Sequence, residues 1–570
     1  MAKTRFSVLN ITLMFSCFMA AILGIIATTG CGTKDSKIQE TAGSIDQVLK
    51  SLRPEAIRAH TEFLADDLLE GRGTGSRGHT IAANYIRAWC EASGLRGGAE
   101  AGGYLQKVPL VRAAVDESQT TLKLESAEGK QILQYGTDFV AMDTHRNTEG
   151  GASGKLVFVG YGVTAPEQAY DDYSGLDVKG KIVVMLRFEA PPSFPPAVRA
   201  YYSDHEIKRA NAAAHGAVGA LYLSSPASEA RLPWLFMLRE LRVGFNSVRW
   251  LRPDGQPGGL DDALKFFGML NRSGAAALFK KEKHSLSDIF TSLEKGVPIR
   301  FDLSKSATLA FRSHHQKEES ENVVSVLEGF DPVLKGEYVV FSTHMDHLGI
   351  GPAVDGDSIY NGAMDNAVGC GVLLEVARCF RSLPERPRRS IIFLFVTGEE
   401  AGLLGSDYFA SNPTMPAKQI VANINLDTGT TLTPVTDVIA WGAEHSSLQT
   451  NVNQASIQAS FTVSPDPFPE EGFFVRSDQF SFVKKGIPSI FVDLGIKSSQ
   501  PGVDALAIMK KWLSTVYHSP KDDLKQPIQY ETSARFARFL FRLGYTIAAN
   551  SGRPHWNEND FFGTKFHSGE

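Results

Sequence analysis

Three short apolar, β-branched runs in the second half of the chain stop at acidic or imidazole residues. The runs are 337–342, Ile391–Val396 and Ile420–Leu426, and the residues that follow them are His344, Glu399 with Glu400, and Asp427. Apolar runs of this length, bounded by polar residues, are typical of buried strands. In open α/β sheets, ligands and chemistry collect beyond the carboxyl ends of the strands. We therefore expect these side chains to meet at one edge of one sheet.

Apolar residues three or four apart predict amphipathic helices at Pro54–Leu69, His79–Ala92 and Ser533–Ala548. Between the first two lies Gly73–Gly78, which has the form G-x-G-x-x-G. A dinucleotide-binding motif of this form follows a strand, whereas this one follows a helix. We interpret it as a flexible loop.

The pattern changes twice along the chain. From about residue 150, short strands are predicted at Lys155–Gly160, Lys181–Phe188 and Gly219–Leu223, between clusters of Gly, Pro and Asp, and 232–274 has an irregular pattern. From about residue 320, strands alternate with helices. The sequence predicts an α/β fold with a mixed, mostly parallel central sheet flanked by helices. We expect a discontinuous domain at 49–142 and 320–552, a β-rich insert domain at 143–319, and a tail at 553–570 without an assigned role.

Length and charge narrow the class of protein. A chain of 570 residues favours two or three domains. The net charge is −5, from 58 basic and 63 acidic residues, and no long basic run is present, which argues against a nucleic-acid partner. Cys90, Cys370 and Cys379 lack the paired spacing of a disulfide framework or a zinc finger.

Residues 1–31 have the pattern of a targeting segment. Lys3 and Arg5 precede an apolar stretch, and Gly30-Cys31 resembles the end of a bacterial lipobox, although Thr28 stands where such boxes usually carry Leu. The stretch is also long enough to be an uncleaved anchor. Residues 32–48 are small and polar, as in a linker. Either interpretation places the body of the protein on the exported, periplasmic or cell-envelope side, tethered to the membrane through Cys31 or the apolar segment.

Polar candidates for chemistry gather in the second α/β segment. They are His344, Asp346, Asp365, Glu399, Glu400, Asp427 and His518. Oxygen and imidazole ligands without thiolate suit a catalytic zinc, cobalt or manganese site. Two histidines and three carboxylates, one of them bridging, give two metals three protein ligands each. One more carboxylate then moves the proton of the attacking water. Glu399 and Glu400 can supply a ligand and this base, and the spacing does not say which is which.

Each candidate alone has a plainer interpretation. Asp365 could cap the following helix, and a single His344 or His518 could be a hydrogen-bonded structural histidine. Asp346 is placed two residues after His344 to hold the other ring nitrogen of that histidine. We interpret His347 as structural, together with His314 and His315. The conjunction of five candidate ligands at strand ends and loops favours a metal site.

The motifs in this segment resemble those of one peptidase family. They are His344-Met-Asp, Asp365-Asn-Ala-Val-Gly, Thr397-Gly-Glu-Glu-Ala-Gly-Leu-Leu-Gly-Ser, Asn425-Leu-Asp and Tyr517-His-Ser-Pro. The series resembles the co-catalytic di-zinc exopeptidases of family 28, which include bacterial aminopeptidases, glutamate carboxypeptidase II and the non-peptidase transferrin receptors. The resemblance covers 49–550 and implies two Zn²⁺ ions, with Co²⁺ or Mn²⁺ as possible substitutes.

The resemblance also assigns roles. It implies that His344 and Asp427 bind one zinc, that Glu400 and His518 bind the other, that Asp365 bridges them, and that Glu399 is the general base. It further implies a cis peptide bond after Asp365. The segment from Gly160-Tyr-Gly-Val-Thr to Gly180-Lys-Ile-Val-Val is similar to the protease-associated domain often inserted in these enzymes.

The expected function is that of an exported zinc aminopeptidase, which removes amino-terminal residues from peptides with a metal-activated hydroxide and a glutamate base. Three alternatives stay open. A carboxypeptidase of the glutamate type would need a basic cluster for a free carboxylate, to which Arg476 could contribute. Glutaminyl cyclase uses one zinc and fits less well. A receptor-like relative would have lost the chemistry, and the complete ligand set argues against that.

Overall fold

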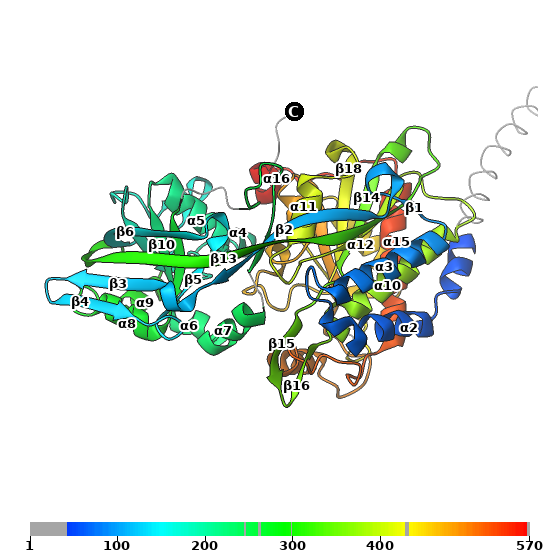
Figure 1. Cartoon of the computed structure of the whole chain (residues 1–570). Coiled ribbons are helices and arrows are strands. Elements are labelled where there is room, and N and C mark those ends of the chain that lie inside the picture. The colour runs from blue at the N-terminus through cyan, green and yellow to red at the C-terminus, as the bar shows by residue number, and fades with distance from the viewer. Residues whose placement is uncertain (1–42, 244–246, 260–263, 298, 428–431, 567–570) are drawn as a thin grey trace, which may run out of the picture.

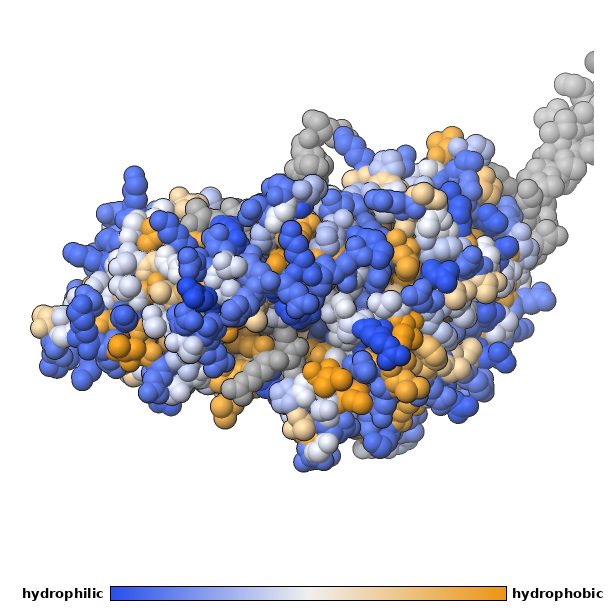
Figure 2. Space-filling view, viewed as in Figure 1, coloured by the Kyte–Doolittle hydropathy of each residue, from blue (hydrophilic) through white to orange (hydrophobic). Residues whose placement is uncertain are grey.

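The computed structural model describes residues 43–243, 247–259, 264–297, 299–427 and 432–566. The chain forms two lobes, which long strands connect (Figure 1). On the face shown in Figure 2, hydrophilic residues surround scattered apolar patches. The predicted leader at 1–31, with Cys31, and most of the predicted linker lie outside the described residues. Among the helices described, none combines the length and apolar character that a bilayer-spanning helix needs.

The larger lobe is built on a mixed sheet. Its strands are β1 (Arg96–Gly97), β2 (Leu105–Val115), β11 (Val248–Trp250), β13 (Phe301–Leu327), β14 (Tyr338–His344), β17 (Ser390–Val396), β18 (Ile420–Leu426), β19 (Asp437–Trp441), β20 (Thr462–Val463) and β21 (Ser489–Leu494). The centre runs β17, β14, β18, β21, all parallel, while β13 and β19 pair antiparallel to its two sides. The predicted mixed, mostly parallel sheet is confirmed.

Helices cover both faces of this sheet (Figure 1). One face carries α2 (Pro54–Leu64), α3 (Arg77–Ala92), α10 (Val368–Arg381), α12 (Leu448–Gln458) and α15 (Tyr530–Ala549), and the other carries α11 (Leu404–Ser411) and α13 (Gln479–Val483). The predicted helix at 54–69 ends five residues early, because the segment Asp67–Arg72 turns as a kinked 3₁₀ helix. The apolar stripe of α15 includes Phe536, Leu540 and Leu543, which are fully buried.

The smaller lobe is β-rich, as predicted. Its strands are β3 (Thr121–Ser126), β4 (Gly129–Leu133), β5 (Phe139–Met142), β6 (Glu149–Phe158), β9 (Ile182–Leu186), β10 (Gly219–Leu223), β12 (Phe266–Leu270) and the first part of β13. Its helices are α4 (Pro196–Ser203), α5 (His205–Ala214), α6 (Pro226–Arg231), α7 (Trp234–Val243), α8 (Arg272–Phe279) and α9 (Leu286–Glu294). β3, β4 and β5 are paired into this sheet. The smaller lobe therefore begins before residue 143, where the insert domain was expected to start.

The prediction that 232–274 is irregular is wrong. The segment contains α7, β11 and β12, and β12 is a central strand between β10 and β5. The strands are only three and five residues long. A stretch this short is recognised only where turn residues mark its two ends, and here Gly and Pro occur throughout the segment. The pairing partners, which lie far away in sequence, define them.

One long strand connects the lobes. β13 pairs with β3 through Ser306–Ala310 and then with β2 through Ser313–Val323, so it belongs to both sheets. Figure 1 shows β13 running the length of the molecule beside β2. From Ser313 to Val323, β13 and β2 are paired continuously, so this two-stranded ribbon connects the smaller lobe to the larger sheet.

The tail also contacts both lobes. Its short helix α16 (Phe561–Phe566) lies at their junction (Figure 1). Phe562 is fully buried and packs against Phe474 of the larger lobe, with ring centroids 5.0 Å apart. Lys565 donates a hydrogen bond to the hydroxyl of Tyr202 in α4 at 3.0 Å. The tail, to which the sequence pattern assigns no role, thus contacts both lobes and holds the smaller lobe against the larger.

Candidate metal centre

The strand ends bring the predicted residues together. His344 is the last residue of β14, Asp427 directly follows β18, and Glu399 and Glu400 lie in the turn after β17. These strands are parallel and neighbouring, with His344 opposite Val396. Their carboxyl ends therefore open at the same edge of the sheet.

Two loops complete the group. Asp365 lies in an irregular turn before α10, and the expected cis peptide bond joins it to Asn366. His518 follows α14 (Ala505–Thr515) and has a positive φ of 53°. His344, Asp365, Glu400 and His518 are all buried, and the side chain of Asp427 is 24% exposed. The centre is thus mostly closed, with Asp427 on its open side.

The donor atoms fall into two sets that share Asp365. In the first set, Nε2 of His344 lies 3.2 Å from Oδ1 of Asp365 and 3.3 Å from Oδ1 of Asp427. In the second, Nε2 of His518 lies 3.4 Å from Oδ2 of Asp365 and 3.0 Å from Oε2 of Glu400. The two oxygens of Asp365 therefore face different histidines, as expected of a bridging carboxylate.

These spacings fit zinc. Ligand atoms on one tetrahedral zinc ion lie about 3.3 Å apart, because each bond is about 2.0–2.1 Å long. The His344, Asp365 and Asp427 donors satisfy this spacing and form one of the groups that could hold a metal. The nitrogen and oxygen donors, without cysteine, are those of a catalytic zinc site.

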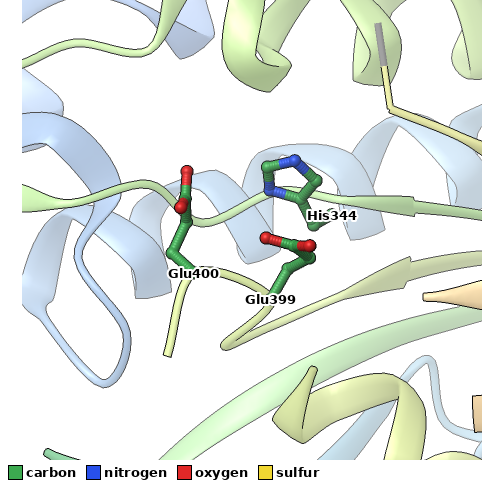
Figure 3. Close-up of side chains that lie close together, drawn as sticks. All are labelled: His344, Glu399 and Glu400. Atoms are coloured by element: carbon green, nitrogen blue, oxygen red, sulfur yellow. The ribbon is translucent and has the colours of Figure 1, made fainter. Parts of the chain in front are cut away.

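Glu399 and Glu400 leave one turn in different directions. Figure 3 shows the carboxylates of Glu399 and Glu400 on different sides of the imidazole of His344. Glu400 points into the second donor set, and Glu399 belongs to neither of the two sets. The geometry separates the two neighbouring glutamates, which the sequence spacing left ambiguous. The metal-binding and catalytic roles of all these residues stay predictions.

The position of Asp346 differs from its predicted one. Its carboxylate lies 3.9 Å from Nδ1 of His344, whereas its backbone carbonyl lies 3.2 Å from that nitrogen and is the hydrogen-bond acceptor. The carboxylate instead accepts hydrogen bonds from the backbone N–H of Glu399 at 3.2 Å and from the Thr74 hydroxyl at 3.1 Å. Asp346 thus orients the turn that carries Glu399 as well as His344.

His347 was interpreted as structural, but the structure places it in the centre. Its Nδ1 lies 2.6 Å from Oε1 of Glu400 and 3.9 Å from Oδ2 of Asp365. The side chain is fully buried. A histidine three residues after His344 gives no helical or strand signal of its own, so only the fold shows this contact.

Burial and neighbouring charges shift the pKa values of the carboxyl groups in opposite directions. Burial raises the pKa of Glu399 well above its usual value, and the charges of Asp427 and Glu400 add to this against the opposing effect of His344. Burial also disfavours the charged form of Glu400, but His518 and His347 outweigh it and lower the pKa to about 2. A proton is therefore held more easily on Glu399 than on Glu400, which suits an acid–base role for Glu399.

Arg72 holds two loops of the centre together through backbone hydrogen bonds. It is fully buried and donates hydrogen bonds to the backbone carbonyls of Leu64, of Met345 at 2.9 Å, of Asn361 at 2.6 Å and of Gly362 at 3.0 Å. It thereby ties the loop after β14 to the loop that carries Asp365. The sequence does not predict these buried contacts, because a single arginine is usually exposed.

The segment Gly73–Gly78 is a loop, as predicted, only as far as Ser76, because α3 begins at Arg77. Gly73 forms a β-bridge with His347, the side chain of Ser76 caps α3, and Gly78 lies within that helix. At Gly78, an added Cβ would meet the carbonyl oxygen of Leu69 at 1.7 Å. The glycines here permit close backbone packing next to the centre.

Two further residues support the ligands. The carboxylate of Asp522 accepts hydrogen bonds from the backbone N–H groups of Met364 and Asp365, both at 3.0 Å. Its burial, partly offset by His347, raises its pKa to about 6. The Ser477 hydroxyl donates to Oδ2 of Asp427 at 2.9 Å. Asp522 could have been suspected from its position four residues after His518, while Ser477 carried no signal.

A cavity of about 270 Å³ opens beside Glu400 and His347. Its other walls include Glu70, Thr74, Arg112, Val248 and Ile350. Arg112 is held by Glu318 at 2.7 Å. The cavity gives a small molecule or a peptide end access to the second donor set.

Comparison with known proteins identifies part of the chain. Residues 322–543 match the family model of Peptidase family M28. The chain is 31% identical over 132 residues to the aminopeptidase NAALADL1 of Mus musculus, a match that covers 22% of this chain and 16% of that protein. It is 29% identical over 124 residues to the aminopeptidase YwaD of Bacillus subtilis (strain 168), covering 22% of this chain and 24% of that one. The chain covers less than a quarter of the length of each of these relatives.

A solved structure shares the fold. The aminopeptidase from Aneurinibacillus sp. strain AM-1 superposes with a TM-score of 0.51 at 19% identity, covering 89% of this chain and 97% of that chain. The family match includes every donor of the two sets, from His344 to His518. The segment from residue 322 to residue 543 belongs to Peptidase family M28.

Proposed function

We propose that the chain is a zinc-dependent aminopeptidase that removes residues from the free amino end of peptides. One observation carries this: two sets of three donors share the carboxylate of Asp365, with neighbouring donors 3.0–3.4 Å apart. The match to a peptidase family supports the reaction class. The names of the mouse and Bacillus relatives support the aminopeptidase activity.

The proposed roles follow the geometry. His344 and Asp427 hold one zinc, Glu400 and His518 hold the other, and Asp365 bridges. Bound there, two zinc ions would lower the pKa of a water and polarise the scissile carbonyl. Glu399 stands beside the first set without joining it, so it can take the proton of the attacking water and deliver it to the leaving amine. Asp346 fixes the backbone of Glu399 in that position.

The carboxypeptidase alternative receives less support. Arg476, its candidate anchor, is 59% exposed and paired with Glu471 at 3.2 Å. The arginine that lines the cavity, Arg112, is neutralised by Glu318. Neither is a free cation ready for a substrate carboxylate, whereas Glu70 lines the same cavity and can attract an ammonium group.

Export and membrane attachment belong to the same proposal. The charged, apolar and small-residue pattern of residues 1–31 supports an exported protein tethered through Cys31 or the apolar segment. Labelling cells with a radioactive lipid precursor, for the wild type and Cys31→Ser, would separate these cases. Label on the wild type alone supports lipidation.

The test of the function combines metal content with substrate choice. The wild type should contain about two zinc ions per chain and cleave aminoacyl-anilides, but not amino-blocked peptides. Glu399→Gln should keep both metals and its melting temperature while losing about 10²–10⁴-fold in kcat, the usual contribution of a general base. Cleavage of amino-blocked peptides from the carboxyl end would show that the proposed substrate class is wrong, although the proposed metal centre would stand. A wild type without metal or turnover would overturn the proposal.

A further inference from the structure

The second donor set contains an imidazole that the two-metal arrangement does not use. His347 and His518 both approach Glu400 and Asp365, and their ring centroids are 5.8 Å apart. The first set, around His344, contains a single imidazole. The two halves of the centre are therefore unequal.

The backbone fixes His347 in place. Its N–H donates to the carbonyl of Arg72 at 3.2 Å, and it forms a β-bridge with Gly73. Across the ring, Gly362 approaches so closely that a Cβ there would lie 2.5 Å from Cγ of His347. The ring is thus held between the anchored Arg72–Gly73 segment and the loop that carries Asp365.

Distances distinguish the parts played by the two imidazoles. His518 lies 3.0 and 3.4 Å from its oxygen neighbours, close to the spacing of about 3.3 Å between ligands of one zinc ion. Nδ1 of His347 lies 2.6 Å from Oε1 of Glu400, within the range of a charge-assisted hydrogen bond, and 3.9 Å from Oδ2 of Asp365. Within the described residues, neither Nδ1 of His347 nor Oε1 of Glu400 makes a hydrogen bond to any other group. His347, Asp365 and Glu400 also form a group that could hold a metal ion, but the uneven distances of His347 favour contact with Glu400 alone.

The two oxygens of Glu400 are also divided. Oε2 faces His518, and Oε1 faces His347. A carboxylate that binds a metal through one oxygen can still rotate unless its other oxygen is held. His347 is the residue positioned to hold it.

We propose that His347 is a positioning residue of the second metal position: its Nδ1–H donates a hydrogen bond to Oε1 of Glu400, so that Oε2 is presented to the metal together with His518 and Asp365. This inference rests on the proposed two-metal function. It makes the second metal position dependent on one more side chain than the first.

Zinc affinity tests this in the full-length protein. The wild type, His347→Ala, His347→Asn, His347→Gln, His518→Ala and His555→Ala would be titrated with zinc against a competing chelator, and Co²⁺-loaded samples compared by visible absorption. His555 is an exposed histidine at the surface and serves as the matched control. His347→Ala should weaken the second metal about 10–100-fold, as loss of an outer hydrogen bond to a ligand usually does, and leave the first unchanged.

Rescue separates positioning from a general loss of packing. The amide nitrogen of His347→Asn is bonded to Cγ, as Nδ1 of the imidazole is, so this variant can donate to Oε1 and should recover most of the lost affinity and the wild-type Co²⁺ spectrum. His518→Ala should lose the second metal altogether. If His347→Ala does not fold, His347→Gln, whose amide nitrogen takes the place of Nε2 instead of Nδ1, should show the same weakening.

Other outcomes overturn the inference. Wild-type affinity in His347→Ala means that Glu400 needs no such support. A loss as complete as that of His518→Ala, without recovery in His347→Asn, makes His347 a ligand instead. A wild type without metal would refute the proposed function itself, and so the two failures are distinguishable.

Discussion

The molecule buries two clusters of charge, and they are balanced differently. Where the lobes meet, Asp143 of the smaller lobe is 1% exposed and lies between two buried arginines, Arg209 of α5 and Arg249 of β11 in the larger sheet, the second at 2.7 Å. In the larger lobe, Asp365, Glu400 and Asp427 lie within 3.4 Å of imidazoles. An imidazole is positive only when it is protonated.

The difference separates a structural cluster from a functional one. The arginines hold the pKa of Asp143 far below its usual value, despite its burial, so its charge is satisfied within the protein. Among the described residues, the ion pairs of Asp365, Glu400 and Asp427 are all with imidazoles, and none is with an arginine or lysine. Burying unpaired charge is costly, and divalent cations would compensate it. The candidate site therefore differs from the structural cluster in its unbalanced negative charge more than in its burial.

Removing the metals should have the largest effect. Prolonged chelation should abolish activity and lower the free energy of unfolding by about 4 kcal/mol for each metal present at a thousand times its dissociation constant. Hydrogen exchange should rise in the loops around Asp365 and His518 but not in β9 and β10 of the smaller lobe. Calorimetry and exchange before and after zinc is restored would check this. Equal loosening of both lobes would contradict the proposed contrast.

Breaking the balanced cluster should come second. Asp143→Asn removes the buried carboxylate that Arg209 and Arg249 share, and should cost about 3–5 kcal/mol of stability while metal content stays unchanged. The matched control is Asp302→Asn, because Asp302 is 64% exposed and pairs with Lys181. This exposed pair should contribute less than about 1 kcal/mol. Urea unfolding of both variants measures the difference, and similar values would refute the distinction.

The smallest effect concerns Lys208, another buried charge of the smaller lobe. Its ammonium donates to the carbonyls of Leu186, at 2.9 Å, and Glu189, and burial lowers its pKa to about 7. Between pH 7 and about 10.5, the unfolded chain binds one more proton than the folded chain, so Lys208 adds stability as the pH rises, by about 1 kcal/mol per unit. Below pH 7 both states are protonated and the contribution is constant.

Unfolding of the wild type and Lys208→Met at several pH values checks this sign. The stability of the wild type relative to the variant should grow between pH 7 and pH 9. A constant difference would mean that Lys208 keeps its proton in the folded state.

The local sequence pattern was enough to predict some helices and strands. The helix predicted at 533–548 is α15, Tyr530–Ala549, because its apolar stripe repeats over five turns. The strand predicted at Gly219–Leu223 has those bounds in the structure. By contrast, β12 has the same length but was not predicted, and its place between β10 and β5 depends on partners from distant parts of the chain.

The same contrast holds for the candidate site. The sequence by itself determined which side chains follow the ends of the parallel strands, because an apolar run that stops marks both the strand and its end. Tertiary structure alone decided the contacts of Arg72, His347 and Ser477. It also decided which of Glu399 and Glu400 faces the second donor set. These contacts join residues that are distant in sequence, or depend on the direction of a turn, and no local period records either.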